Sequence, residues 1–400
     1  MSSRRKFIRS VAGGLAGGLT PSKVLGANDR IRLGFIGVGE RGMELAREAA
    51  LCSNTEVSAV ADVYSRRREM ALELLPQARG FEDARRLLDD AHIDAVVIAT
   101  PPHLHGQYVL AALDAGKHIY VERTLAFDID EAQRVRRACQ QSAGKLMVQV
   151  GHQACSSGLM TDALKFVQSG KLGKITMIEA HMFRNTPHGK PQWARPVYPD
   201  MTPEHICWEA FLGSAPKREF DAYRYANWRL FWDYSGGNVF ENMSQQAAFW
   251  FRALNLPVPL AATMRGGILR WKDGREVPDS MSVVLEFSDD LLFSWISGFG
   301  NNQLGVGESV LGTDGTILKS QQIRFLPQKV NQPKGEEILG DTPTPPRAHL
   351  QNFLDAIRSG HKPNCCFELG YRVSVACRMA VESYRQQRTI RWDASREELI

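Results

Sequence analysis

The sequence predicts an α/β protein in which an N-terminal doubly wound parallel sheet precedes a C-terminal α+β domain with a large open, mainly antiparallel sheet. Up to about residue 150, short apolar runs such as IRLGFIGV and IDAVVIAT alternate with amphipathic stretches, the pattern of strands buried on both faces and connected by helices. From about Lys174 the strand-like runs are longer, and turns at Asp289-Asp290 and Asp314-Gly315 fold two of them back. We therefore expect domains at 28–150 and 151–400.

The end of the chain and the open sheet lead to two further expectations. Two helical stretches within residues 346–388 follow the proline cluster TPTPP and are expected to pack back on the first domain or against the second. A sheet with one open face commonly pairs with a copy of itself, so we expect a homo-oligomer formed through the C-terminal sheet.

Residues 1–27 have the composition of a targeting segment. SSRRKFIRS places two arginines before the apolar, glycine-rich VAGGLAGGL, and VLGAN offers small residues for cleavage. This resembles a twin-arginine signal and predicts an exported, periplasmic or extracytoplasmic protein; the alternative is a basic tail on a cytoplasmic one. No later run reaches the ~18 apolar residues that a spanning helix needs, so we expect no membrane insertion of the mature chain.

The net charge gives no indication of a nucleic-acid partner. The chain has 49 basic and 44 acidic residues, and five of the basic ones lie in residues 1–27, which contain no acid. The remaining chain is therefore balanced.

A glycine pattern gives the strongest chemical signal. Gly37, Gly39 and Gly42 stand at the end of an expected strand and the start of an expected helix, with Glu40 and Arg41 inside the loop. Such glycines permit a tight turn, close approach of the backbone to a pyrophosphate and close packing of helix on strand, while the helix N-terminus offers free N–H groups. The pattern predicts a Rossmann dinucleotide-binding domain.

The identity of the nucleotide is open between two cofactors. Asp62 ends the next expected strand, where its carboxylate would accept both ribose hydroxyls and repel a 2′-phosphate. This favours NAD. Arg67, with its arginine neighbours on either side, keeps NADP possible.

The ends of the later strands should line the same crevice, because ligands bind outside the carboxyl ends of such sheets. These ends carry Thr100, Pro101, His103 and His105, then Glu122 and Arg123, then His152. The two alternating histidines of the first group have no carboxylate or cysteine partner in the sequence pattern. We expect them to lie beside the cofactor or cap a helix, and we expect no metal site.

Together, the glycine loop, the strand-end aspartate, TPPHLH and the glutamate of VERTL, followed by a sheet domain, resemble the Gfo/Idh/MocA oxidoreductases. The resemblance covers essentially the whole mature chain and implies a sugar substrate. In that family the strand-end motif is usually Glu-Lys-Pro, with a lysine that hydrogen-bonds the reacting hydroxyl, and a histidine follows a Gly-Gly and acidic motif. Here Arg123 and Gln245 stand at those two positions.

These departures matter because neither residue transfers protons readily. Arginine stays protonated at any working pH, and glutamine only donates and accepts hydrogen bonds. Arg123 and Gln245 are therefore expected to orient the substrate. The proton would pass to Glu241, which has a helix-start role as its alternative, or to His181 or His152, for which a structural hydrogen bond is the alternative.

Substrate contacts are expected from Arg184 at the end of a long strand, and from Arg229 and Trp232 in the irregular, proline- and tryptophan-rich segment 185–235. The sequence thus predicts an NAD(P)-dependent oxidoreductase acting on a CH–OH group of a sugar or sugar derivative. Because no soluble nicotinamide pool exists outside the cytoplasm, export favours a tightly bound cofactor. The alternatives are a redox-neutral glycosidase or epimerase and a non-catalytic, cofactor-binding sugar sensor.

Overall fold

The computed structural model describes residues 30–330 and 336–400, and Ile31–Ile400 form one compact unit. The predicted targeting segment 1–27 lies outside the described residues. None of the helices in the described ranges combines the length and the apolar composition that a membrane-spanning segment requires.

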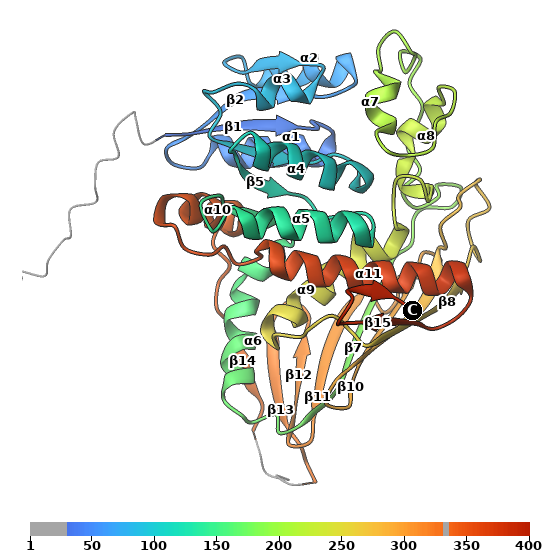
Figure 1. Ribbon diagram of the computed structural model, residues 1–400. Helices are drawn as coiled ribbons and strands as arrows, with labels where there is room; N and C mark the ends of the chain where they lie inside the picture. Colours follow the sequence, from blue (N-terminus) through green and yellow to red (C-terminus); the bar gives the residue numbers. More distant parts are fainter. Residues whose placement is uncertain (1–29, 331–335) are drawn as a thin grey trace, which may run out of the picture. The chain divides into compact units, whose positions relative to one another are not determined.

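The first half forms the predicted parallel sheet, whose six strands run in the order β3-β2-β1-β4-β5-β6. This is the order of a dinucleotide-binding sheet, with the switch point between β1 and β4. The strands are β1 (Ile31–Ile36), β2 (Thr55–Ala61), β3 (Arg79–Phe81), β4 (Ala95–Ile98), β5 (His118–Val121) and β6 (Val148–Val150). The helices between them are α1 (Glu40–Ala50), α2 (Ser65–Leu74), α3 (Ala84–Leu88), η2 (Pro102–Leu104), α4 (His105–Asp114) and α5 (Ile129–Gln141). Figure 1 labels β2, β1 and β5 of this sheet, with helices α1 and α4 beside them.

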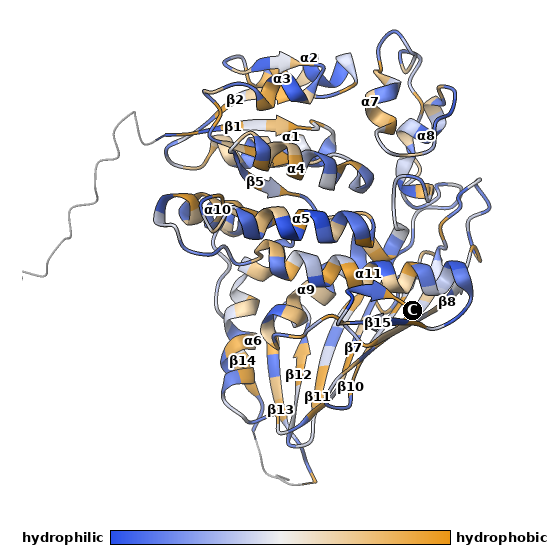
Figure 2. Ribbon diagram, viewed as in Figure 1, coloured by the Kyte–Doolittle hydropathy of each residue, from blue (hydrophilic) through white to orange (hydrophobic). Residues whose placement is uncertain are grey.

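The apolar positions whose periodicity predicted these strands and helices are buried in the structure. All four residues of β4 are buried, as a strand covered on both faces requires. Helix α5 buries Ala132, Val135 and Cys139 and shows hydrophilic residues on its visible surface (Figure 2). Its N-cap is Asp128, whose side chain accepts a hydrogen bond from the backbone N–H of Glu131.

The second half forms a sheet of ten strands in the order β14-β13-β12-β11-β7-β10-β9-β8-β15-β16, which confirms the predicted fold class. Its pairs are antiparallel except for β7 with β10. The strands are β7 (Ile175–Phe183), β8 (Ala261–Gly267), β9 (Ser280–Phe287), β10 (Leu291–Gly298), β11 (Val306–Gly312), β12 (Gly315–Lys319), β13 (Ile323–Pro327), β14 (Ile338–Gly340), β15 (Ile390–Asp393) and β16 (Glu398–Leu399).

Helices cover one face of this sheet. They are α6 (Gly158–Gln168), α9 (Ser244–Ala253) and α11 (Phe367–Gln386), and the short turns η3 (Gln153–Ser156) and η5 (Val239–Met243) pack against these helices. Ile178, Ala180 and Met182 of β7 are buried toward them, whereas Glu179 is exposed on the opposite face. Strands of this half therefore alternate, unlike those of the first sheet.

The two C-terminal helices lie against different parts of the chain. Leu350, Phe353 and Leu354 of α10 (Ala348–Ser359) share a buried cluster with Phe35 and Val97 of the first sheet. Helix α11 contacts both α5 and β8. The first sheet and the helical layer of the second are thus joined by a continuous apolar core.

The segment 185–235 has little regular structure, with α7 (Trp208–Leu212), α8 (Ala222–Ala226) and η4 (Trp228–Leu230) its only helices in the described chain. An isolated bridge pairs Ile206 with Tyr64, directly after β2. Phe211 and Tyr225 pack in the same buried cluster as these two residues. This cluster fixes the segment beside the carboxyl ends of the first sheet.

Candidate active site

The junction of β1 and α1 admits only glycine at two positions, 37 and 42. Gly37 has φ +87°, and a Cβ there would lie 2.9 Å from the backbone of Ala99. A Cβ on Gly42 would lie 2.0 Å from the carbonyl oxygen of Gly37, so helix and strand touch through backbone. Gly39, the N-cap of α1, has no capping side chain, which leaves the first N–H groups of the helix open to a ligand.

Asp62 is held beside this loop. Its Oδ2 accepts a hydrogen bond of 2.9 Å from the N–H of Val38, and its Oδ1 accepts one of 3.0 Å from the N–H of Tyr64. Each carboxylate oxygen has a second lone pair, so the group retains capacity for ribose hydroxyls. The position is the one expected from the sequence, at the end of β2.

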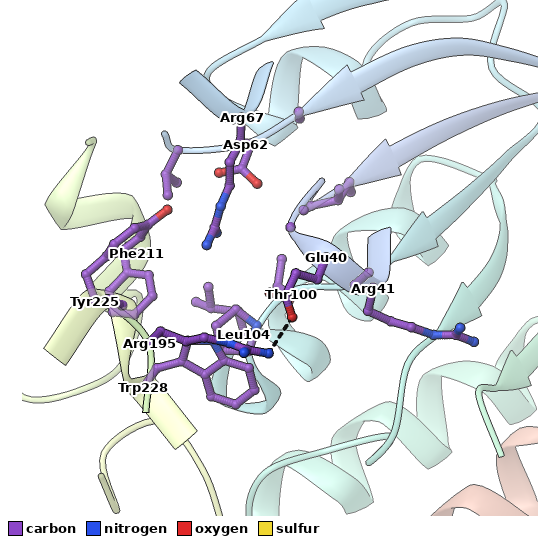
Figure 3. A pocket seen from close by; sticks show the side chains of 18 of the residues that line it. Glu40, Arg41, Asp62, Arg67, Thr100, Leu104, Arg195, Phe211, Tyr225 and Trp228 are labelled. Carbon is purple, nitrogen blue, oxygen red and sulfur yellow. Dashed lines mark hydrogen bonds and ion pairs between the residues drawn. The ribbon is translucent and has the colours of Figure 1, made fainter. Parts of the chain in front are cut away.

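The glycine loop and Asp62 border a cavity that we call the glycine pocket. Its lining includes Gly37, Gly39, Glu40, Arg41, Asp62, Arg67, Thr100, Pro101, Leu104, Arg195, Tyr198, Phe211, Tyr225, Trp228 and Arg229. Figure 3 shows Arg67 reaching into it beside Asp62, with Phe211 and Tyr225 forming another wall. The guanidinium of Arg67 lies 5.3 Å from the ring centroid of Tyr225.

A salt bridge and an unpartnered hydroxyl complete this pocket. Nη2 of Arg195 lies 2.6 Å from Oε2 of Glu40 and joins the segment 185–235 to the first turn of α1 (Figure 3). The buried Oγ1 of Thr100 has no hydrogen-bond partner within the described ranges. Such an orphaned polar atom, next to open helix N–H groups and the backbone cradle, fits a dinucleotide.

His103 and His105 do not line the glycine pocket. Nε2 of His103 lies 2.8 Å from the carbonyl oxygen of Phe211, and burial lowers the pKa of this histidine to about 4. The ring nitrogens of His105 lie 2.6 Å from the carbonyl oxygen of Thr124 and 2.8 Å from that of Thr100. Both histidines thus connect loops that border the pocket.

A second cavity adjoins the first, because Arg195 and Arg229 line both. We call it the arginine pocket. Its lining consists of Arg123, Arg184, Gln192, Trp193, Arg195, Arg229, Glu241 and Asn242. Of the substrate contacts predicted from the sequence, Arg184 and Arg229 are here, whereas Trp232 packs against Tyr384 with ring centroids 6.0 Å apart.

Arg123 links the two halves of the chain. Its Nε donates a 2.9 Å hydrogen bond to the carbonyl oxygen of Glu241, and its Nη1 donates one of 3.1 Å to Oε2 of Glu122. Burial raises the pKa of the Glu122 carboxyl, but the charges of Arg41 and Arg123 outweigh burial and hold that pKa below its usual value. Glu122 is therefore an anion that fixes the Arg123 side chain.

Glu241 is the single carboxylate in the lining of the arginine pocket. Its Oε2 lies 3.3 Å from Nε of Arg229 and 3.7 Å from Nη2 of Arg123. The residue is 7% exposed and belongs to a π-helical turn, η5, a feature frequent at functional sites. A carboxylate between two guanidinium groups at the cavity wall can accept a hydroxyl proton.

Gln245 lies behind this wall, where its Nε2 donates a 3.1 Å hydrogen bond to Oε1 of Gln153. With its amide turned over, its oxygen would accept hydrogen bonds from Nε and Nη1 of Arg123, at 3.2 and 3.3 Å. Gln153 in turn donates to Glu122. Gln245 therefore supports the Arg123 side chain from behind.

The two other predicted proton carriers lie away from both cavities. His152 is fully buried, and neither ring nitrogen has a partner in the part of the chain that the structure describes. Burial, reinforced by the charge of Arg123, lowers its pKa to about 3. His181 alternates with the inward-facing Ala180 and Met182, and its Nε2 lies 3.3 Å from the carbonyl oxygen of Leu304.

Sequence reasoning missed Gln192, Trp193, Arg195 and Asn242 as lining residues. Their signal was indirect, since the first three belong to the irregular segment expected to shape a site. Nothing in their local pattern distinguishes them from other polar loop residues.

Comparisons with known proteins agree with this geometry. Residues 31–152 match an oxidoreductase family with an NAD-binding Rossmann fold. An inositol 2-dehydrogenase of Salmonella paratyphi B is 30% identical over 155 residues, which are 38% of this chain and 46% of the relative. That of Paracoccus denitrificans is 35% identical over 123 residues, 30% of this chain and 36% of the relative. The chain thus spans about half or less of the length of these relatives.

Two solved structures share the fold over 90% of this chain. The apo scyllo-inositol dehydrogenase from Lactobacillus casei has a TM-score of 0.65 and 18% identity, over 98% of its own chain. A levoglucosan dehydrogenase in complex with NADH and levoglucosan has a TM-score of 0.69 and 18% identity, over 99% of its chain.

Proposed function

We propose that the chain, whose residues 31–152 match the Gfo/Idh/MocA family of oxidoreductases, is a member of that family and an NAD-dependent dehydrogenase acting on a CH–OH group of a sugar or sugar-like substrate. The observation that carries the proposal is the junction of two cavities through Arg195 and Arg229. One cavity is bordered by the glycine loop and Asp62, and the other contains a carboxylate and several hydrogen-bond donors. A reduced or oxidised nicotinamide and a polyol would meet at this junction.

The glycine loop, the N-terminus of α1, Asp62 and Thr100 would hold the cofactor. Bound NAD would supply a hydride acceptor for the hydrogen and two electrons of the carbinol C–H bond. Asp62 favours NAD, and Arg67, which lines the same pocket, keeps NADP as the alternative. Arg123, fixed by Glu122 and by the carbonyl oxygen of Glu241, directs charge toward the reacting oxygen.

We assign proton transfer to Glu241. The hydroxyl proton passes to its carboxylate, and the alcohol becomes a carbonyl group. Of the candidates from the sequence, only Glu241 combines proton-accepting chemistry with a place in a cavity wall. His152 stays neutral beneath the site because its pKa is about 3, and His181 lies on the other face of the sheet.

Tight cofactor binding, export and homo-oligomer formation are further parts of the proposal. The wall formed by Tyr198, Phe211, Tyr225 and Trp228 opposite the glycine loop supports tight binding. Export rests on the twin arginine in residues 1–27, and the oligomer on the face of the ten-stranded sheet where Glu179 is exposed.

The test is to purify the protein, titrate NADH and NADPH by fluorescence, and follow absorbance at the reduced-nicotinamide band with NAD and neutral or acidic sugars or their glycosides. We expect NADH binding and sugar-dependent reduction of NAD. Failure to bind either nucleotide contradicts the proposal. Release of an aglycone without net NADH formation would indicate the redox-neutral glycosidase, and sugar binding without turnover the sensor.

A further inference from the structure

We propose that the arginine pocket binds an anionic group of the substrate, a carboxylate or a phosphate, so that the substrate class is acidic sugars rather than neutral ones. This rests on the proposed function, because it names the substrate of the same site.

The first argument is charge. Four guanidinium groups and one carboxylate line the arginine pocket. Glu241 is shared between Arg123 and Arg229, and Arg195 pairs with Glu40 at the other cavity. Glu122 also pairs with Arg123, so three carboxylates stand against the four guanidinium groups that line the pocket. The excess positive charge, inside a concave and partly desolvated site, attracts an anion.

The second argument is Arg184, which directly follows β7. It is half-buried, and its guanidinium makes no hydrogen bond or ion pair with any residue in the described ranges. Burial and the positive charge of Arg123 lower its pKa, although a guanidinium keeps its proton at any working pH. The Arg184 guanidinium thus stays charged, faces a cavity and is repelled by Arg123. A carboxylate or phosphate would supply the missing partner, because either can accept two parallel hydrogen bonds from a guanidinium.

The third argument is Trp193, which lines the same cavity. Its φ of +71° is rare for a bulky residue and costs backbone energy, and such outliers cluster at ligand sites. Its ring is held edge-on to Phe299 with centroids 4.9 Å apart. An aromatic side chain beside guanidinium groups suits a sugar ring that carries a charged substituent.

These positions also specify the orientation of the substrate. Arg229 lines both cavities, whereas Arg184 lines only the arginine pocket. An anionic group anchored at Arg184 therefore directs the rest of the ring toward Glu241 and the glycine pocket. A neutral sugar would leave Arg184 without a counter-charge beside Arg123.

The experiment is calorimetric titration of the full chain, with and without NADH, using D-glucuronate, D-galacturonate and D-glucose 6-phosphate against their neutral parents D-glucose and D-galactose. Each probe is measured at low and high salt. We expect at least one anion to bind about tenfold or more tightly than its neutral parent, with an advantage that shrinks at high salt. The uronates and the phosphate separate the two possible sources of negative charge.

The variants are Arg184→Gln and, as the matched control, Arg391→Gln on the exposed side of β15. Arg184→Gln is expected to remove the preference for the anion while NADH affinity changes less than about twofold. The control is expected to change neither.

Equal binding of anions and neutral parents overturns the inference, as does an absence of anion binding in a protein that binds NADH; in both cases the proposed dehydrogenase stands. An anion preference that depends on Arg184, in a protein that binds no nucleotide, supports the inference and removes the proposed function.

Discussion

The glycine pocket and the arginine pocket adjoin, yet they are built in opposite ways. The glycine-loop side of the first is formed by backbone: Gly37 and Gly42 approach neighbouring carbonyl and backbone atoms so closely that no Cβ fits, and Asp62 is fixed by two N–H groups. The second is formed by long side chains from segments that are far apart in the sequence, such as Arg123, Arg184 and Glu241. The glycine-loop side of the first pocket is therefore determined by local backbone geometry, whereas the arginine pocket depends on tertiary packing.

Because the two pockets are built differently, substitutions in one should affect different measured properties from substitutions in the other. Changes in the arginine pocket should alter turnover and substrate choice while cofactor affinity stays constant. Changes in the glycine loop should alter cofactor affinity first.

The largest effect is expected for Glu241→Gln. The amide keeps the size of the side chain but accepts no proton, so turnover should fall by about 10²–10⁴-fold. The Kd for NADH should change less than about twofold, because the residue lies in the other cavity. Steady-state kinetics and fluorescence titration measure the two quantities; turnover at the wild-type rate would remove Glu241 as the proton acceptor.

The reverse pattern is expected in the glycine loop. In Gly42→Ala the new methyl group meets the carbonyl oxygen of Gly37 at 2.0 Å. We expect the free energy of unfolding to fall by about 3 kcal/mol and NADH to bind more weakly than in wild type. Gly39→Ala is the matched control, because its methyl group meets only the Arg67 side chain, at 3.6 Å. Its thermal unfolding should stay at the wild-type value while NADH binds about tenfold more weakly. Unchanged affinity in Gly39→Ala would mean that the cofactor backbone does not approach this loop.

The next effect is a pH dependence of stability that arises from the buried His152. His152 has a folded-state pKa of about 3, below the ordinary histidine value of about 6.5. The unfolded chain therefore takes up the proton first, and stability is lost as pH falls from about 6.5 toward 3. In His152→Asn this loss is absent, so the unfolding free energy of the variant relative to wild type should improve by about 2 kcal/mol between pH 7 and pH 5.

The same variant tests whether His152 takes part in the chemistry. Because the imidazole is neutral throughout the assay range, the shape of the pH profile of kcat/KM between pH 5 and 9 should match that of wild type. Loss of an inflection in the variant would assign His152 a proton-transfer role and contradict the choice of Glu241.

The sequence predicted the glycine pocket more completely than the arginine pocket. Gly37, Gly39, Gly42 and Asp62 were found because a tight turn and a close approach to phosphate require fixed residue types at fixed spacing. The two sheets were distinguished because burial on two faces or one face produces different hydrophobic periods.

The arginine pocket was predicted only in part, and the reasons are physical. An α-helix after Gly237 would place Glu241 and Gln245 on one face, but the π turn Val239–Met243 changes the helical phase, and only Glu241 lines the cavity. Trp193 and Arg195 belong to a segment without periodicity, so no pattern indicates where their side chains lie. His181 shows the opposite case, since strand alternation with Ala180 and Met182 could have placed it on the open face.

The smallest effect is expected for Arg123→Lys, which introduces the residue type usual in the family that the sequence resembles. An ammonium group keeps the charge but lacks the planar fork that reaches both the carbonyl oxygen of Glu241 and the carboxylate of Glu122. We expect kcat/KM to fall about tenfold with NADH affinity unchanged, because the lysine leaves one of these two acceptors without its donor. Arg391→Lys serves as the control for the same substitution on an exposed strand. If kcat/KM in Arg123→Lys is equal to or higher than in wild type on every sugar tested, the planar guanidinium at position 123 is dispensable. The positive charge of the arginine pocket would then be sufficient for activity, independently of how its side chains are fixed.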